Sequence, residues 1–145
     1  RDAIESIARL VKLNLDNKKI QLDLNIPEDV RVMADLHMLN AIVRNLISNA
    51  TKFTPTGGAI TVTAAEDGDE VVIKVADTGV GIPPENLDKI FNPNVQTTTE
   101  GTNKEGGSGL GLLLVQDFVQ KNNGKISVES TVGEGTTFAF TLPKA

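Results

Sequence analysis

The sequence predicts an α+β fold, a two-layer sandwich in which a mixed sheet packs against about three helices. Two observations lead to this expectation. Some segments have the periodicity of helices and others that of strands, and helices and strands do not follow one another in strict turn along the chain. The 145 residues, 39% of them hydrophobic, suffice for one domain with its own core. No internal repeat and no second domain are visible, so we expect residues 1–145 to form a single domain.

The first third of the chain predicts a helix, a strand and a longer helix. Apolar residues at steps of three and four favour a helix over residues 2–17, and alternation over residues 20–26 favours a strand that Pro27 ends. A short second strand is predicted around Val30 and Val32. Asp35 is the expected N-cap of a helix that runs through Lys52. The expected apolar stripe of this helix consists of Leu36, Leu39, Val43, Leu46, Ile47 and Ala50.

Strands dominate the rest of the prediction. Asp67-Gly68-Asp69 is a hairpin signal, and Asn123-Gly124 marks the end of a helix. Residues 92–108 are polar and lack periodicity, and a loop of this length inside a compact domain is usually functional. The predicted elements are strands at 59–66 and 70–77, helices at 83–90 and 110–122, and strands at 125–131 and 136–142.

Composition excludes several kinds of function. The net charge of −5 argues against a protein that binds a nucleic-acid backbone, although backbone N–H groups can still hold a small anion. The chain has no cysteine and one histidine, which excludes thiol catalysis and zinc sites built from thiolate or histidine ligands. His37 is expected to be an ordinary surface side chain. No apolar stretch is long enough to span a membrane.

The predicted long helix carries three polar residues on one face. Asn45, Asn49 and Lys52 lie within roughly 60° of one another on a helical projection, away from the apolar stripe. Carboxamide oxygens can ligate Mg²⁺, and a lysine ammonium can meet a phosphate. Taken alone, these residues are better interpreted as ordinary polar surface.

Two further segments combine a strand or helix end with glycines. Asp77 ends an apolar strand and is followed by Gly79 and Gly81, so its carboxylate could accept an amino-group hydrogen bond in a pocket; a plain turn is equally compatible. The segment 106–112, rich in glycine, opens a helix and offers free N–H groups at the positive end of the helix dipole. A flexible hinge is the alternative there. Gly133-Glu134-Gly135 alone predicts only a hairpin.

The order and spacing of these segments resemble the ATP-binding catalytic domain of sensor histidine kinases. They are similar to the N box, the D-x-G-x-G box, the F box and the later glycine boxes of that family, and they cover nearly the whole chain. The resemblance implies the Bergerat ATP-binding fold, which gyrase, Hsp90 and MutL ATPases share. The matching segments are Asn45…Asn49-Ala50-x-Lys52-Phe53-Thr54, Asp77-x-Gly79-x-Gly81, Phe91, Gly107-x-Gly109-x-Gly111 and Gly133-x-Gly135-Thr136.

The resemblance implies a role for each matching residue. Asn49 would ligate Mg²⁺, Asn45 would support the same site, and Lys52 would contact phosphate. Asp77 would accept a hydrogen bond from the amino group of adenine. The other implied assignments are Gly79 and Gly81 as pocket wall, residues 92–108 as a mobile ATP lid, Gly107, Gly109, Leu110 and Gly111 as phosphate contacts, and Thr137 closing the adenine pocket.

The chain departs from the family pattern at its F box. Asn94 stands where a second aromatic residue usually follows Phe91-Asn92-Pro93, and Lys104 is the candidate lid cation. No phosphoacceptor histidine motif is present; in the family it lies on a helical dimerisation domain that precedes this one. Because the chain begins at Arg1 rather than methionine, we expect a fragment that starts just after that domain.

The activity implied by the resemblance is that of a histidine kinase catalytic domain. The chain would bind Mg-ATP and donate the γ-phosphoryl group to a histidine on a separate dimerisation domain, which then feeds a response regulator receiver domain in two-component signalling. The assisting base would lie beside that histidine, so slow turnover is expected of the isolated chain. We expect a cytoplasmic, monomeric fragment with no nucleic-acid partner and no direct membrane contact.

Two other functions remain open at this point. ATP hydrolases and anti-sigma-factor serine kinases of the same superfamily place a glutamate base four residues before the metal-binding asparagine. Asn45 occupies that position here, and a carboxamide cannot act as a general base. A degenerate, non-enzymatic interaction module is the other possibility. Only the altered F box favours it, whereas Asn49, Asp77 and the glycines are intact.

Overall fold

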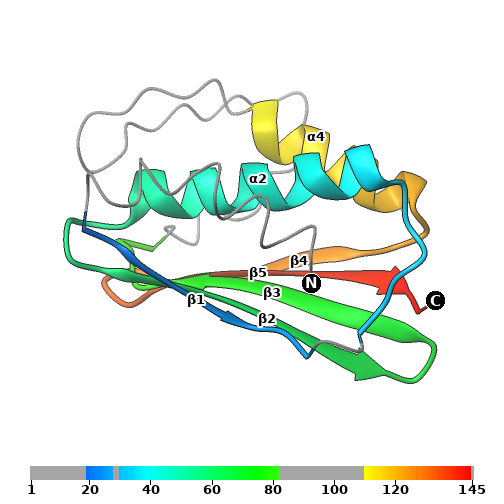
Figure 1. Cartoon of the computed structure of the whole chain (residues 1–145). Coiled ribbons are helices and arrows are strands. Elements are labelled where there is room, and N and C mark those ends of the chain that lie inside the picture. The colour runs from blue at the N-terminus through cyan, green and yellow to red at the C-terminus, as the bar shows by residue number, and fades with distance from the viewer. Residues whose placement is uncertain (1–18, 28–29, 82–109, 145) are drawn as a thin grey trace.

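The computed structural model describes residues 19–27, 30–81 and 110–144, which form a sheet covered on one face by helices. Figure 1 shows the two described helices, α2 and α4, side by side above the strands. This arrangement confirms the predicted α+β sandwich. The elements are β1 (Gln21–Asn25), α2 (Leu36–Phe53), β2 (Ala59–Asp67), β3 (Glu70–Asp77), α4 (Leu110–Lys121), β4 (Ile126–Thr131) and β5 (Gly135–Pro143).

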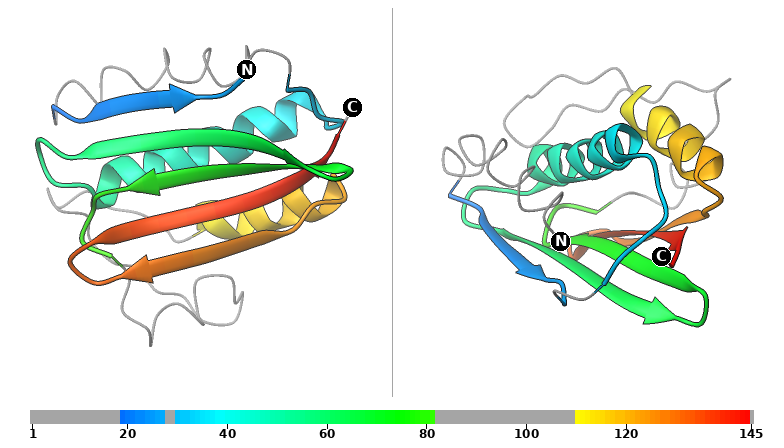
Figure 2. Two further views of the ribbon diagram at one scale, coloured as in Figure 1. Left: turned by 90° about the horizontal axis from the view of Figure 1, so that it is seen from below. Right: turned by 45° about the vertical axis from the view of Figure 1, so that its right-hand side comes forward.

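The sheet is mixed, with the strand order β1-β2-β3-β5-β4. β1 runs parallel to β2, and each of the other neighbouring pairs is antiparallel. The left view of Figure 2 shows this sheet from the side opposite the helices, with β1 and β4 at its two edges. The predicted hairpin joins β2 to β3, and Gly68 takes the positive φ of +62° that its turn needs.

Strand alternation builds the core between the sheet and the helices. In β3 and β5 every second side chain is buried, because successive residues of a strand point to opposite faces. The apolar side of α2 packs onto this face, and Val115 and Val119 of α4 join it. Its largest fully buried side chains are Phe138, Phe140, Ile42, Leu46, Ile47, Ile60 and Leu142.

Asp35 caps the long helix, as predicted. Its Oδ1 atom accepts a hydrogen bond from the backbone N–H of Met38 at 2.9 Å, which satisfies one of the donors left free in a first helical turn. Leu36 was assigned to the apolar stripe, and this is wrong because its side chain is 59% exposed. As the first residue of α2, Leu36 lies before the turns that pack against the sheet.

Most other predicted elements agree with the structure to within about two residues. The expected strand around Val30 and Val32 is reduced to one bridge between Val32 and Lys144. The helix α4 ends where Asn123 adopts a φ of +64° and the N–H of Gly124 bonds to the carbonyl of Val119. The helices predicted at 2–17 and 83–90 and the loop at 92–108 lie outside the described residues. Within the described ranges, neither helix combines the length and hydropathy that a membrane span requires.

Candidate functional site

A buried carboxylate at the end of β3 is the centre of the site. Asp77 continues the inward-facing series of that strand and is 9% exposed. Its Oδ1 atom accepts two backbone hydrogen bonds, from the N–H of Gly79 at 2.8 Å and from the N–H of Thr136 at 3.2 Å. The first bond closes a tight turn, and the second ties the carboxylate to the neighbouring strand β5.

The environment of Asp77 leaves one oxygen available. Burial raises the pKa of Asp77 above its ordinary value of 3.8, and the hydrogen bonds from Gly79 and Thr136 act in the opposite direction. Both of those bonds end on Oδ1, while Oδ2 accepts none from the described residues. A half-satisfied buried carboxylate is a strong acceptor for a ligand's N–H group.

The loop after Asp77 is held between two other parts of the fold. The N–H of Val80 bonds to the carbonyl of Phe53, the last residue of α2, at 3.2 Å, and the N–H of Gly133 bonds to the carbonyl of Val80 at 2.9 Å. A Cβ on Gly79 would lie 2.5 Å from the Phe53 oxygen, and one on Gly81 would lie 2.4 Å from the Thr131 oxygen. These two glycines therefore allow a backbone contact that no other residue permits.

Strand β5 completes the surroundings of Asp77 with Thr136 rather than Thr137. Thr136 is paired directly with Asp77 and is 6% exposed. Its hydroxyl lies 2.8 Å from the hydroxyl of Ser130 on β4. Thr137, which the sequence assigned to the pocket, is paired with Ala76 and therefore faces the opposite side of the sheet. The structure does not bring it to Asp77; alternation with Phe138 would have identified Thr136 instead.

The three polar residues of α2 share one side of the helix, as their spacing predicts, and all are half-buried. The Nδ2 atom of Asn45 donates to the carbonyl of Ala41 at 2.7 Å. The ammonium of Lys52 lies 5.1 Å from the centre of the Phe53 ring. The carboxamide of Asn49 makes no hydrogen bond to another described residue.

Both glycine-containing segments, at Gly79 and at Gly111, contact the helix α2. A Cβ on Gly111 would lie 3.0 Å from Oδ1 of Asn45, which places the start of α4 against this helix. Gly79 meets the C-terminal end of α2 at Phe53. Phe53 lies eight positions after Asn45, which is about 12 Å of helix. The chain therefore places a buried acceptor and a helix N-terminus at two points along one helix.

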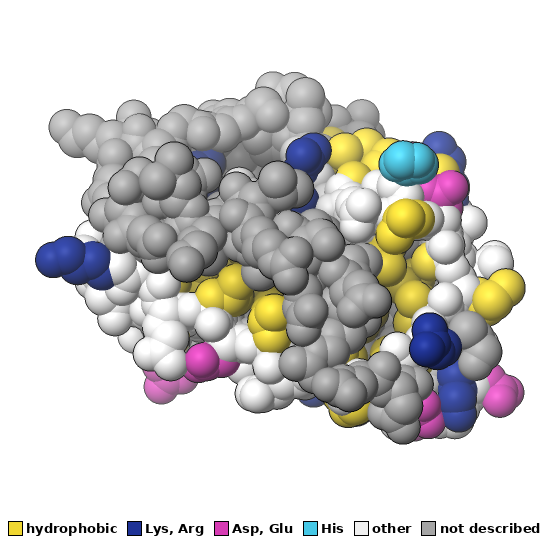
Figure 3. All heavy atoms as spheres, viewed as in Figure 1, with side chains coloured by type: hydrophobic (Ala, Val, Ile, Leu, Met, Phe, Trp, Pro, Cys, Tyr) yellow, Lys and Arg dark blue, Asp and Glu magenta, His cyan; other side chains and the backbone are white. Residues whose placement is uncertain are grey.

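Some predicted site residues lie outside this description. Gly107 and Gly109, the lid at 92–108, Phe91 and Lys104 lie outside the described residues, as does the side chain of Leu110. His37 is exposed, as predicted, and is the cyan side chain on the surface in Figure 3. Within the described ranges, no three His, Cys, Asp or Glu side chains are grouped to hold a metal ion.

Comparison with known proteins assigns the family. Residues 34–145 match the family described as histidine kinase-, DNA gyrase B- and HSP90-like ATPases. The chain belongs to this family. It is 42% identical over 144 residues to the histidine protein kinase DivJ of Caulobacter vibrioides, covering 99% of this chain and 24% of DivJ. It is 36% identical over 149 residues to the autoinducer 2 sensor kinase/phosphatase LuxQ of Vibrio parahaemolyticus, covering 98% of this chain and 17% of LuxQ.

Solved structures agree with this assignment. The catalytic domain of the histidine kinase ThkA matches with a TM-score of 0.85 and 28% identity, covering 99% of this chain and 92% of that one. Full-length ShkA in complex with AMPPNP matches with a TM-score of 0.81 and 31% identity, covering 99% and 30%. ThkA in complex with the response regulator TrrA matches with a TM-score of 0.79 and 27% identity, covering 99% and 40%. The fold is thus that of histidine kinase catalytic domains, an ATP-binding fold. The chain spans about a quarter or less of the curated relatives described above.

Proposed function

We propose that this chain binds Mg-ATP and donates the γ-phosphoryl group to a histidine on a separate dimerisation domain. The observation that carries the nucleotide proposal is the state of Asp77. Its Oδ1 is saturated by Gly79 and Thr136, whereas Oδ2 accepts nothing from the described residues. An adenine amino group is a donor of the kind that such an acceptor selects.

The phosphates would lie nearer the middle of α2. There the first turn of α4 meets Asn45 through Gly111. A helix N-terminus presents free N–H groups and positive potential to an anion. Gly107, Gly109 and Leu110 belong to this proposed phosphate segment because they immediately precede or open α4. Lys52, on the same side of α2 as Asn45, would supply a cation.

Asn49 is the proposed Mg²⁺ ligand. Its half-buried carboxamide makes no hydrogen bond to another described residue and lies one helical turn from Asn45. Mg²⁺ typically takes one or two protein oxygens together with phosphates and waters, so a single amide oxygen on α2 fits it. When bound, the ion would neutralise phosphate charge. Asn45 would support the site from the next turn, with its amide group already oriented by the Ala41 carbonyl.

The proposed reaction is phosphoryl transfer to a histidine outside this domain. Such transfer depends mainly on positioning and charge neutralisation, which the site would provide. The position four residues before Asn49 holds Asn45, a carboxamide that cannot act as a base, and this weighs against an ATP hydrolase. The complex of ThkA with TrrA supports a response regulator as the further partner of the parent protein. We place the domain in the cytoplasm, where ATP is found.

Calorimetric titration with ADP and AMPPNP, with and without Mg²⁺, tests the proposal. We expect one nucleotide per chain. Asn49→Ala should remove the gain in AMPPNP affinity that Mg²⁺ gives and leave binding of Mg²⁺-free ADP unchanged. Ser48→Ala, at an exposed neighbouring position, is the matched control and should behave as the unaltered chain. No binding at millimolar nucleotide would exclude this function and favour a non-enzymatic module.

A further inference from the structure

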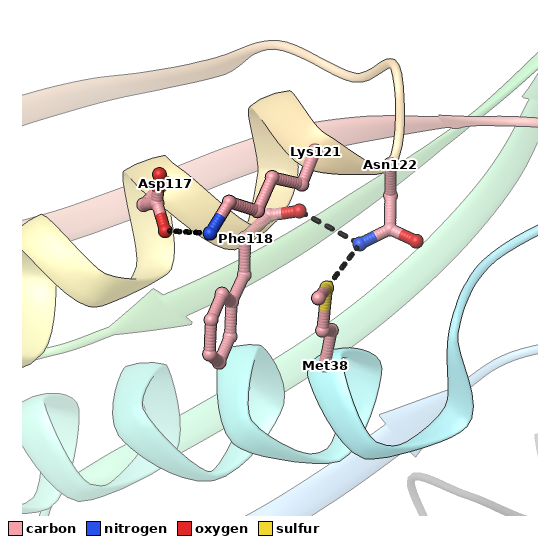
Figure 4. A network of polar contacts seen from close by, with 5 residues as sticks. All are labelled: Met38, Asp117, Phe118, Lys121 and Asn122. Atoms are coloured by element: carbon pink, nitrogen blue, oxygen red, sulfur yellow. Dashed lines mark hydrogen bonds and ion pairs between the residues drawn. The ribbon is translucent and has the colours of Figure 1, made fainter.

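A carboxamide links the two described helices at the end away from the site. Asn122 directly follows α4 and is 9% exposed. Its Oδ1 accepts the backbone N–H of Asp35 at 2.8 Å, and its Nδ2 donates to the sulfur of Met38 at 3.2 Å. Nδ2 also donates to the carbonyl of Phe118 at 2.7 Å within α4. Figure 4 shows this group between the last turn of α4 and the first turn of α2.

These side-chain contacts are not required to satisfy the backbone N–H groups at the end of α4. The backbone N–H of Asn122 and that of Gly124 already bond to carbonyls in the last turn of α4. The nearby ion pair between Lys121 and Asp117 is more than half exposed on both sides and adds little. The bonds to Asp35 and Met38 do something different, since both cross to α2.

The contact at Asn122 and the contact at Gly111 mark the two ends of one antiparallel helix pair. Met38 lies beside Asn122, and Asn45 lies beside Gly111. Gly111 and Asn122 are eleven positions apart, which is about 16 Å along a stiff helix. Because a helix moves as a rigid rod on this scale, a shift at the Asn122 end displaces the Gly111 end as well.

The sheet gives α4 a further attachment at the same end. A Cβ on Gly124 would lie 1.9 Å from the carbonyl oxygen of Thr141, and the N–H of Lys125 bonds to the Thr141 hydroxyl. These contacts tie the end of α4 to β5, while Val115 and Val119 pack into the core between the sheet and the helices. The Asn122 carboxamide adds the polar contacts that join this end of α4 to the start of α2.

We propose that Asn122 is a positioning residue that sets where the start of α4 lies against Asn45. It does not touch the nucleotide. It holds the far end of α4, so that the N–H groups of the first turn meet the phosphates in the right place. This inference rests on the proposed nucleotide site, and it predicts that Asn122 affects recognition of the phosphates but not of adenine.

The experiment compares ADP with adenosine, which lacks phosphates, on variants of the 145-residue chain. Asn122→Ala removes all three carboxamide hydrogen bonds. Asn122→Ser is milder, because its hydroxyl can still bond the Phe118 carbonyl but cannot reach α2. Val71→Ala, at a fully buried position of β3 at the opposite end of that strand from Asp77, is the control that lowers stability without touching α4.

We expect both Asn122 variants to weaken ADP binding about five- to tenfold, which is of the order that a helix N-terminus contributes to holding an anion. The Kd of adenosine, measured by NMR titration, should stay within about twofold. Val71→Ala should lower Tm while keeping the ratio of the two Kd values. Parallel loss of ADP and adenosine binding, or an unchanged ratio, would show that Asn122 only stabilises the fold.

The design separates this inference from the nucleotide site itself. If the unaltered chain binds neither ADP nor adenosine, the proposed function fails. If it binds both and Asn122→Ser keeps the unaltered ratio, only the positioning role fails. Should Asn122→Ala not fold, as judged by circular dichroism, Asn122→Ser decides the question, because it preserves the hydrogen bond within α4.

Discussion

Burial of the Asp77 carboxylate destabilises its charged form, and its Oδ2 atom is the proposed acceptor for adenine. In Asp77→Asn, the carboxamide oxygen can still accept from Gly79 and Thr136, but an NH₂ donor replaces Oδ2. We expect adenine-nucleotide affinity to fall by about 1–3 kcal/mol because a donor then faces a donor. Calorimetry with ADP measures this loss. Asp67→Asn, at an exposed carboxylate in the β2–β3 turn, is the control, and equal affinity for all three proteins would refute the pocket assignment.

The same residue predicts a pH dependence of stability. Burial raises the pKa of Asp77 above 3.8, so the folded state holds the proton more tightly than the unfolded chain. Stability from this group is fully present below pH 3.8 and is lost as pH rises through the raised pKa. Asp77→Asn lacks this titration. Its Tm minus that of the unaltered chain should therefore grow across that pH window; a difference independent of pH would contradict the burial effect.

Gly79 shows how close backbone contact defines the site. In Gly79→Ala the new Cβ would meet the Phe53 carbonyl at 2.5 Å, so the loop after Asp77 must move. We expect a loss of about 1–3 kcal/mol in stability and weaker ADP binding. Gly68→Ala is the control at a distant turn: a Cβ there has nothing within 4 Å, although its φ of +62° adds backbone strain of its own. It should cost about 1–2 kcal/mol in stability and leave ADP affinity unchanged, as urea titration and calorimetry can measure.

Single residues also show what sequence alone can predict of the site. The carboxylate of Asp77 and the face of Asn45, Asn49 and Lys52 follow from strand and helix periods, which are local properties. Thr136 was missed because the pairing of β5 with β3 is non-local, although the alternation with Phe138 points to the same face. The interhelical contacts of Asn122 have no local signal at all.

At the scale of elements, α2 is the part that brings the site together. Its N-cap at Asp35, its face from Asn45 to Lys52 and its last residue Phe53 each meet a different part of the fold. Asp35→Ala removes the bond to the Met38 N–H and should cost about 1 kcal/mol. Asp117→Ala breaks only an exposed ion pair and should cost no more than about 0.5 kcal/mol. Chemical denaturation compares the two, and equal losses would show that the cap contributes nothing special.

The elements themselves were predictable because their signals are repeated along several residues. Alternation in β2, β3 and β5 gave strands that agree within two residues at each end. The wrong predictions concern residues at the ends of elements, where packing against the rest of the fold determines the structure more than the local sequence pattern does. Leu36 fits the helical stripe but lies before the turns of α2 that pack on the sheet. Val32 forms only a single bridge, to Lys144 near the end of the chain. Strand order in the sheet depends on pairings that no local pattern encodes.

At the scale of the whole molecule, the sheet and the helical layer carry different parts of the proposed nucleotide site. The sheet holds Asp77 at the end of a central strand, and the helices hold the proposed phosphate and metal contacts above it (Figure 1). At the proposed phosphate and metal contacts, none of the described residues is a carboxylate or a histidine: Asn45 is a carboxamide whose Nδ2 is already bonded to Ala41. In the proposed function these residues bind the nucleotide and neutralise its charge, and the nucleophile comes from another domain.

The arrangement predicts slow turnover by the 145-residue chain. In the proposed function the acceptor histidine and the assisting base lie on a separate domain, so ADP release by this chain should stay near the background rate of Mg-ATP hydrolysis. A coupled assay for ADP measures this, with Asp77→Asn as the control for contaminating ATPases. Rapid hydrolysis that disappears in Asp77→Asn would place a base within this chain and contradict the role proposed for Asn45. Slow hydrolysis together with tight AMPPNP binding would instead direct the search to the histidine-bearing domain, whose addition should yield phosphohistidine.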